Sequence, residues 1–178
     1  QLRNSVNFHK NKLEQYETIP NVRRCYNDLD YLHGIQGKLK GKIEQYSNAW
    51  LKLFEILNIY KDNILPLPAN FSTVHLAELP GAMIFAMRHW IWQNAPEVID
   101  GHQWYASSWI NPEAKSLEDM FGLVAKYPDH WWIGQEEGLH GDITDVRQIK
   151  YIESKASGIF DSKNTKIVPI VTGDLGMD

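Results

Sequence analysis

The chain of 178 residues is poor in several features on which functional assignments often rest, beginning with cysteine. It has one cysteine, Cys25, so no disulfide can form within it, and a cysteine-based zinc site is not expected. No apolar run approaches the roughly 20 residues that a membrane-spanning helix needs, and no basic start followed by an apolar segment indicates a signal peptide. We therefore expect no membrane partner.

Motifs of several other chemistries are also missing. The glycine patterns G-x-G-x-x-G and G-x-x-x-x-G-K-[ST] do not occur, which leaves phosphate binding by a glycine loop without support. The seven histidines are scattered and include no H-E-x-x-H, so we expect no metal site. The G-x-S-x-G motif of many serine hydrolases is absent as well.

The composition that remains is that of a globular protein, with 43% hydrophobic and 22% charged residues. The net charge is −4 but is uneven along the chain. Residues 1–50 carry 8 basic against 5 acidic residues, and residues 51–178 carry 10 against 17. A polyanion that contacts only the first part would suit this distribution. An ordinary variation in surface charge explains it equally well.

Apolar periodicity predicts a long helix near the start of the chain. The apolar residues recur at steps of three and four and form one face: Ile35, Leu39, Ile43, Tyr46, Trp50, Leu53 and Leu57. The helix should end near Tyr60, before the loop that contains Pro66 and Pro68. Residues 1–34 are polar and predict an extension of short helices and loops.

Strands and helices are expected to alternate through the rest of the chain. Short apolar runs predict strands at residues 71–77, 103–110 and 166–172, the last of them buried. Helices are expected at residues 82–93, 114–126 and 144–156, the last capped by Thr144 or Asp142. This alternation is typical of a mostly parallel α/β sheet.

Polar breaks follow the predicted strands, and ligands of parallel sheets bind at the carboxyl ends of strands. The breaks lie at residues 78–81, 111–112, 141–142 and 173–174. Glu78 can accept hydrogen bonds from a ligand amine or hydroxyl, and Gly81 can let the backbone approach a ligand. A turn with no ligand is the alternative interpretation of Pro80–Gly81.

Five tracts, in order over residues 47–178, resemble the motifs of FtsJ-like (RrmJ-like) ribose 2′-O-methyltransferases. Residues 47–56 resemble the signature S-R-A-x-x-K-L-x-E-I, and residues 75–82 resemble the A-P-G-G/A cofactor loop. Three more tracts are similar to the adrift, or cap-2, branch: residues 104–112 to S-L-N-P, residues 131–143 to W-x-x-G…G-D-I, and residues 171–176 to V-T-A-D-G-G.

The resemblance implies a Rossmann-like core that binds S-adenosylmethionine. It makes Lys52 and Asp174 the first two members of the family's Lys-Asp-Lys-Glu catalytic tetrad. The cofactor contacts that it implies are Glu78, Pro80, Gly81 and Ala82 at the amino-acid end, Asn111 at the ribose, and Asp142 with Ile143 at the adenine. Without the resemblance, Lys52 would be a solvated lysine near Glu55, and Asp142 a helix cap.

Departures from the motifs indicate a divergent member of the family, such as one from a large DNA virus. Asn48 stands where arginine is typical, Leu79 where alanine is usual, and Leu175 where the family has glycine. The second lysine and the glutamate of the tetrad should follow Asp174. We therefore interpret residues 35–178 as the N-terminal part of the methyltransferase domain. A C-terminal remainder, present as a separate fragment, would complete it.

The function implied is methylation of a ribose 2′-hydroxyl of RNA, in the mRNA 5′ cap region, with capped RNA as partner. The protein would act in the cytoplasm, which for a virus is the host cytoplasm. One alternative is an inactive relative that binds RNA, the cofactor or a protein. An oxidoreductase-type nucleotide fold is disfavoured by the missing glycine motif. The tryptophans are interpreted mainly as core residues, with stacking on RNA bases as the alternative: Trp90, Trp92, Trp104, Trp131 and Trp132.

Overall fold

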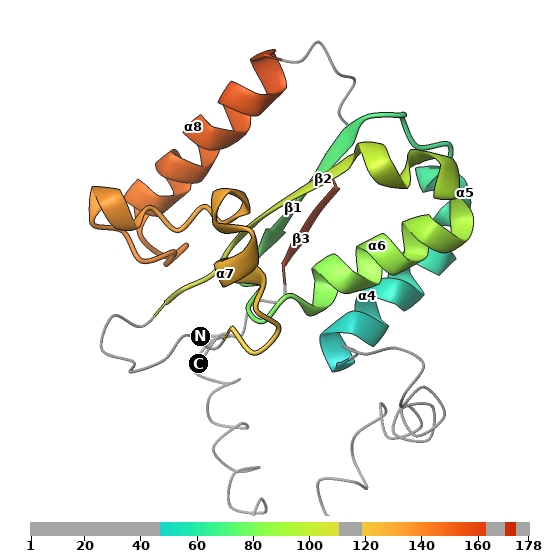
Figure 1. The fold of residues 1–178 in the computed structure, drawn as a ribbon, viewed down its shortest axis with the longest axis horizontal. Helices are drawn as coiled ribbons and strands as arrows, with labels where there is room; N and C mark the ends of the chain where they lie inside the picture. Colours follow the sequence, from blue (N-terminus) through green and yellow to red (C-terminus); the bar gives the residue numbers. More distant parts are fainter. Residues whose placement is uncertain (1–46, 111–118, 163–169, 174–178) are drawn as a thin grey trace, which may run out of the picture. The chain divides into compact units, whose positions relative to one another are not determined.

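A computed structural model of the chain describes residues 47–110, 119–162 and 170–173. Its centre is a sheet of three parallel strands in the order β2-β1-β3 (Figure 1), namely β1 (Phe71–Leu76), β2 (His102–Ser107) and β3 (Ile170–Gly173). A parallel bridge joins Ala106 of β2 to Trp131. The predicted α/β fold is confirmed and is consistent with a Rossmann-like methyltransferase core. The predicted extension at residues 1–34 lies outside the described residues.

Helices surround this sheet. The longer ones are α4 (Asn48–Ile59), α6 (Ala82–Asn94) and α8 (Val146–Ser162). The shorter elements are α5 (Lys61–Ile64), α7 (Leu123–Lys126) and the 3₁₀ turns η1 (Pro96–Gly101), η2 (Pro128–His130) and η3 (Gln135–Glu137). No helix in these described segments is long and apolar enough to cross a bilayer.

Three of the predicted elements are confirmed closely. The strand at residues 71–77 and the helix at residues 82–93 correspond to β1 and α6. Helix α4 buries Trp50, Leu53 and Leu57 and ends before Tyr60, as the apolar stripe predicts. The first part of that stripe, residues 35–46, lies outside the described residues.

Strand β2 ends at Ser107 and not at residue 110. Beyond Ser107 the chain leaves the ladder because its polar groups find other partners. The Ser108 hydroxyl accepts from the Leu79 N–H at 3.3 Å, and the Ile110 N–H donates to the His140 carbonyl at 2.8 Å. These bonds turn the end of β2 toward the loops beside it.

The helix predicted at residues 114–126 is too long at its start. Residues 119–122 form a turn, and α7 covers only Leu123–Lys126; residues 111–118 lie outside the described residues. Gly122 has a φ of 67°, a left-handed conformation that interrupts a helix. The Asp119 carboxylate accepts from the Ala125 N–H at 3.1 Å and so caps the short helix.

The helix predicted at residues 144–156 is α8, which begins and ends later. Neither proposed cap is the residue that caps it. Asp145 accepts from the Arg147 N–H at 2.8 Å, in the geometry of an N-cap. Asp142 instead accepts from the N–H and the hydroxyl of Thr144, at 2.9 and 2.7 Å, and holds the preceding turn.

The last predicted strand is present as β3, but the expectation that it is buried is wrong for Val171. That side chain is 58% exposed. β3 lies at one end of the order β2-β1-β3, so it has a single strand neighbour in the described sheet, and residues 163–169 lie outside the description. Its half-exposed residues alternate with exposed ones, as at a sheet edge.

The two faces of the sheet carry different helices, because neighbouring residues of a strand point to opposite sides. Trp104 packs in a buried cluster with Ile84 of α6 and Leu123 of α7. Tyr105, the next residue, lines a cavity with Tyr151 of α8. Helices α6 and α7 therefore cover one face and α8 the other, and α4 packs against α6 (Figure 1).

A buried chain of hydrogen bonds crosses all three strands. The Thr73 hydroxyl lies 2.9 Å from Nε2 of His102 on β2 and 2.9 Å from Nε2 of His75 on its own strand. Nδ1 of His75 lies 2.7 Å from the Thr172 hydroxyl on β3. Thr73 and His75 are wholly buried and His102 is 3% exposed. The chain therefore fixes β1 laterally between both neighbours.

Both imidazoles in this chain resist protonation. Burial lowers the pKa of His75 to about 3, with a further contribution from His102. Burial also lowers the pKa of His102 to about 3, with a further contribution from the Arg88 guanidinium. Each ring is therefore neutral near pH 7 and can serve as donor at one nitrogen and acceptor at the other.

We predict that the protein loses stability as the pH falls from 6.5 toward 3. In this window the unfolded chain binds protons that the folded protein does not, which lowers the free energy of unfolding by up to about 1.4 kcal/mol per pH unit for each histidine. Urea unfolding at several pH values measures this slope. His75→Gln should reduce the slope, whereas His140→Gln, at an exposed position, should not. Equal slopes for both variants and the wild type would contradict the assignment.

Candidate active site

The residues predicted to bind the cofactor lie beyond the carboxyl end of β1. The chain passes from β1 to β2 on one side, and β3 lies on the other side of β1. In parallel sheets, ligands bind where the loops after two neighbouring strands leave in opposite directions; the loop after β3 lies outside the described residues. Ala77, the first residue after β1, has a φ of 54° and turns the chain out of the strand. The predicted contacts follow directly, namely Glu78, Pro80, Gly81 and Ala82.

Glu78 has a structural role that the sequence did not reveal. Its side chain is 4% exposed, and its Oε1 accepts from the N–H groups of Met83 at 2.7 Å and Ile84 at 3.0 Å. These groups belong to the first turn of α6, where a carboxylate is favoured by hydrogen bonding and by the helix dipole. Glu78 therefore joins the end of β1 to the start of α6.

Gly81 is required by packing. It has a φ of 116°, and a Cβ at this position would collide with the Leu123 side chain of α7. Leu123 thus occupies the side on which we expected a ligand to approach. Pro80 is half-buried and Ala82 is 6% exposed, so this loop is a compact link between β1 and α6.

Backbone contacts tie three loops together at the same edge. The Glu78 N–H donates to the Ser107 carbonyl at 3.3 Å, which joins the ends of β1 and β2. A Cβ at Gly141 would meet the Ser108 carbonyl, so only glycine permits this close approach. Asp142 follows Gly141 and is thereby held near the same edge as Glu78. Asp142 and Ile143 are both half-buried.

Gln148 is a site-building residue that sequence reasoning missed. It is wholly buried; its Oε1 accepts from the Gly141 N–H at 3.2 Å, and its Nε2 donates to the Trp132 carbonyl at 2.8 Å. It fixes α8 to the loop that carries Asp142. Gln148 precedes Tyr151, Ile152 and Lys155 by three, four and seven residues, so all four lie on the same side of α8. This helical spacing was the signal in the sequence that could have identified Gln148 as facing the sheet.

Of the two predicted catalytic residues, only Lys52 lies within the described residues. Lys52 is exposed on α4, whose Trp50 ring lies 5.6 Å from the ring of His89 on α6. Asn111 and Asp174 lie outside the described residues. The roles of Lys52, Asp174 and Asn111 stay predictions.

The donor set at this edge fits a cationic cofactor such as S-adenosylmethionine. Most of the N–H groups of the loop after β1 are engaged within the protein: those of Glu78, Leu79, Gly81, Met83 and Ile84. The loop therefore offers few donors to an anion, while Glu78 and Asp142 contribute negative charge. A glycine loop that binds phosphate has the opposite arrangement, with backbone N–H groups directed at the anion. In the described segments, no group of three or more His, Cys, Asp or Glu residues could hold a metal ion.

We predict that Gly81→Ala destabilises the protein by about 1–3 kcal/mol, because the new methyl group strains the backbone and displaces Leu123. Gly158→Ala is the matched control. Gly158 lies within α8 with no atom near a built Cβ, so alanine there should stabilise by about 0.5–1 kcal/mol. Denaturant unfolding of both variants measures the difference. A neutral Gly81→Ala would contradict this packing role.

No family model and no solved structure matches the chain. It is 35% identical over 153 residues to uncharacterized protein L511 of Acanthamoeba polyphaga mimivirus, a match that covers 84% of this chain and 18% of that protein. It is 28% identical over 156 residues to probable methyltransferase EP424R of African swine fever virus, covering 80% of this chain and 34% of that protein.

A third relative comes from an animal. The cap-specific mRNA (nucleoside-2′-O-)-methyltransferase 2 of Drosophila melanogaster is 28% identical over 185 residues, which covers 99% of this chain and 25% of that protein. The chain thus spans between 18% and 34% of the length of these curated relatives. The predicted resemblance to methyltransferases is confirmed at this coarse level: the chain is similar to viral and animal proteins that bear this name.

Proposed function

We propose that the chain forms part of an S-adenosylmethionine-dependent methyltransferase that acts on a ribose 2′-hydroxyl of RNA, in the mRNA 5′ cap region. The observation that carries the proposal is the acidic edge at the switch point of a parallel sheet, with Glu78 and Asp142 on neighbouring loops. The names of the viral and Drosophila relatives support the reaction class, and that of the Drosophila relative supports the substrate. The site of action would be the cytoplasm, which for a viral protein is that of the host.

In this proposal the cofactor lies across the carboxyl ends of the strands. Its amino-acid end lies at Glu78, Pro80, Gly81 and Ala82, its ribose at Asn111, and its adenine at Asp142 and Ile143. When bound, it supplies an electrophilic methyl group on a positively charged sulfur. The carboxylates would attract that cationic ligand. The hydrogen bonds from the N–H groups of residues 78 and 79 to the Ser107 carbonyl and the Ser108 hydroxyl would keep its binding surface rigid.

The target hydroxyl would be held by Lys52 and Asp174. A ribose 2′-hydroxyl is a poor nucleophile, and its proton must leave near the transition state. Lys52 extends from α4, which packs against the site helix α6. Asp174 directly follows β3, at the carboxyl end where parallel-sheet sites form. Together they would orient the hydroxyl and its proton toward the methyl donor.

Cofactor binding can be tested with two aspartates three residues apart in sequence. Asp142→Asn keeps the Oδ1 acceptor that holds the turn to Thr144 but removes the negative charge, so we expect about tenfold weaker binding of S-adenosylmethionine. Asp145→Asn keeps the cap of α8 and serves as the control with unchanged affinity. Isothermal titration calorimetry measures both. Absence of binding to the wild-type protein, or equal affinity of the two variants, would count against the cofactor site.

The catalytic role of Lys52 can be tested separately. Lys52→Ala should lower methyl transfer to capped RNA by about 100-fold or more, with cofactor affinity unchanged. Lys61→Ala, at an exposed position on α5, should retain full activity. Transfer of a labelled methyl group to the RNA 2′-oxygen is the readout. If Lys52→Ala and wild type transfer methyl groups equally fast, Lys52 has no role in catalysis.

A further inference from the structure

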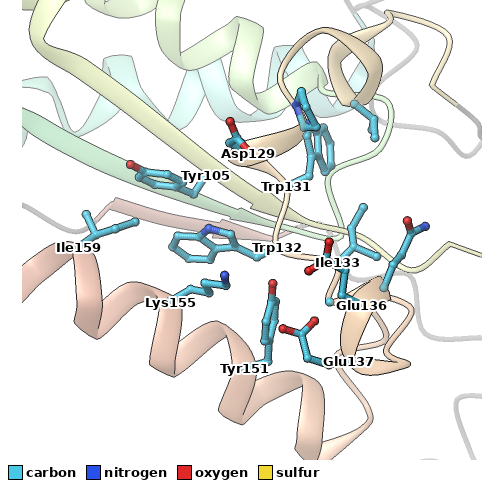
Figure 2. Close-up of a pocket in the computed structure, with 14 residues that line it drawn as sticks. Tyr105, Asp129, Trp131, Trp132, Ile133, Glu136, Glu137, Tyr151, Lys155 and Ile159 are labelled. Atoms are coloured by element: carbon cyan, nitrogen blue, oxygen red, sulfur yellow. The ribbon is translucent and has the colours of Figure 1, made fainter.

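A cavity lies away from the predicted cofactor loops, on the face of the sheet covered by α8. Its volume is about 500 Å³, within the range of about 300–1,000 Å³ typical of small-molecule sites. It lies between α8, the segment from η2 to η3, and the outward face of β2 (Figure 2). None of the residues predicted to bind the cofactor lines it. The cavity is therefore a separate candidate site.

Aromatic rings form one wall of this cavity. Trp132 stacks on Tyr105 with ring centroids 4.7 Å apart and an angle of 16° between the planes, and His130 stacks on Tyr105 at 5.5 Å. Trp132 ends this row of three rings. Figure 2 shows Tyr151 and Lys155 extending from α8 toward Trp132. Nζ of Lys155 lies 5.2 Å from the centroid of the Tyr151 ring.

Trp132 is more deeply buried than the two α8 side chains that line the cavity with it. The Trp132 side chain is 3% exposed, but the neighbouring Lys155 is exposed and Tyr151 is half-buried. A lysine side chain changes rotamer at small cost, so a flat ligand can enter beside Tyr151 and continue the row of rings. The same movement would bring the Lys155 ammonium to the rim of the cavity.

The charges of the lining restrict the ligand. Asp129, Glu136 and Glu137 contribute three carboxylates, against the single ammonium of Lys155. Glu136 and Glu137 line the same cavity as Tyr151 (Figure 2). Such a site accepts hydrogen bonds from a ligand and repels a chain of several phosphates. A single phosphate can still pair with Lys155 at the rim. The ligand is therefore a flat ring with donors along one edge.

Among the nucleobases, guanine meets this requirement best. Its Watson–Crick edge carries two adjacent donor groups, N1–H and N2–H₂, which match the two oxygens of a carboxylate. Adenine and cytosine each place an acceptor beside the amino group on that edge, and uracil has acceptors on both sides of its single donor. A carboxylate would repel those acceptors. A guanidinium side chain could also pair with the carboxylates, but it would leave most of the volume empty.

We infer that this cavity binds a guanine base of the RNA, stacked on Tyr151 and Trp132, with its donor edge at Glu136 and Glu137 and its phosphate at Lys155. The inference rests on the proposed function, because RNA is the substrate in that proposal. The subsite would position RNA against the α8 face of the sheet, on the opposite side from α6.

The test is calorimetric titration of the chain with 5′-GMP and 5′-AMP. We expect GMP to bind at least about tenfold more tightly than AMP. The double variant Glu136→Gln/Glu137→Gln should lose this preference, because each amide replaces one of the two acceptor oxygens with an NH2 group, which opposes a donor of the guanine edge. Glu153→Gln, exposed on α8 and outside the lining, is the control that retains it. Equal binding of both nucleotides, or a preference that survives the double variant, would overturn the inference.

Two further comparisons test the remaining contacts. Lys155→Ala should weaken the binding of GMP but not that of guanosine. An equal effect on both would show that Lys155 does not contact the phosphate. A short RNA with one guanine should bind more tightly than the same RNA with adenine at that position. A chain that binds GMP but shows no such RNA preference would have a free-nucleotide site, which overturns the assignment to RNA.

These outcomes are separable from failure of the proposed function. If methyl transfer to RNA proceeds but GMP and AMP bind alike, only the guanine subsite is wrong. If the guanine preference is found but S-adenosylmethionine does not bind, only the methyltransferase proposal is contradicted.

Discussion

A buried chain of polar side chains holds the central strand between its two neighbours, and the position of the candidate site depends on it. Thr73 and His75 of β1 bond to His102 of β2 and Thr172 of β3. Among the described residues, Nδ1 of His102 is the one ring nitrogen of this hydrogen-bonded chain that has no hydrogen-bond partner. A shift in register would leave further buried groups unpaired, each at a cost of about 1–3 kcal/mol. The carboxyl ends of the strands are therefore aligned at one edge.

The residues at that edge combine structural and functional roles. Glu78 caps α6, Gly81 makes room for Leu123, and Asp142 holds a turn. At Gly81 the structural role narrows the approach of a ligand, because Leu123 occupies the side on which we expected one. The contacts of Glu78 mean that loss of activity on changing this residue would not by itself identify a ligand contact. Substitutions that keep the local hydrogen bonds, as at Asp142, distinguish the two roles.

Both faces of the sheet pack against helices, and each carries a cavity. On the face under α6 and α7, Ile84, Trp104 and Leu123 belong to a buried cluster and also line a cavity of about 520 Å³. On the face under α8, Gln148 bonds that helix to the loops beside the candidate site, and a cavity of about 500 Å³ lies beside Tyr105. Helices therefore support the site edge from both faces of the sheet. Of the tryptophans expected in the core, Trp92 is the exception, at 61% exposed.

The sequence by itself determined the alternation of strands and helices, the central strand, helix α6 and the acidic loop that follows β1. These features depend on local periodicity and on turn residues, which act over a few positions. It did not determine where β2, α7 and α8 begin or end, since those boundaries depend on partners distant in sequence, such as His140 for Ile110. The tertiary structure alone decided that Glu78 caps a helix, that Gln148 is buried at the site edge and that β3 has an exposed face. The physical reason is that burial and hydrogen-bond pairing are set by which segments meet, and a residue's own neighbours in the chain do not specify that.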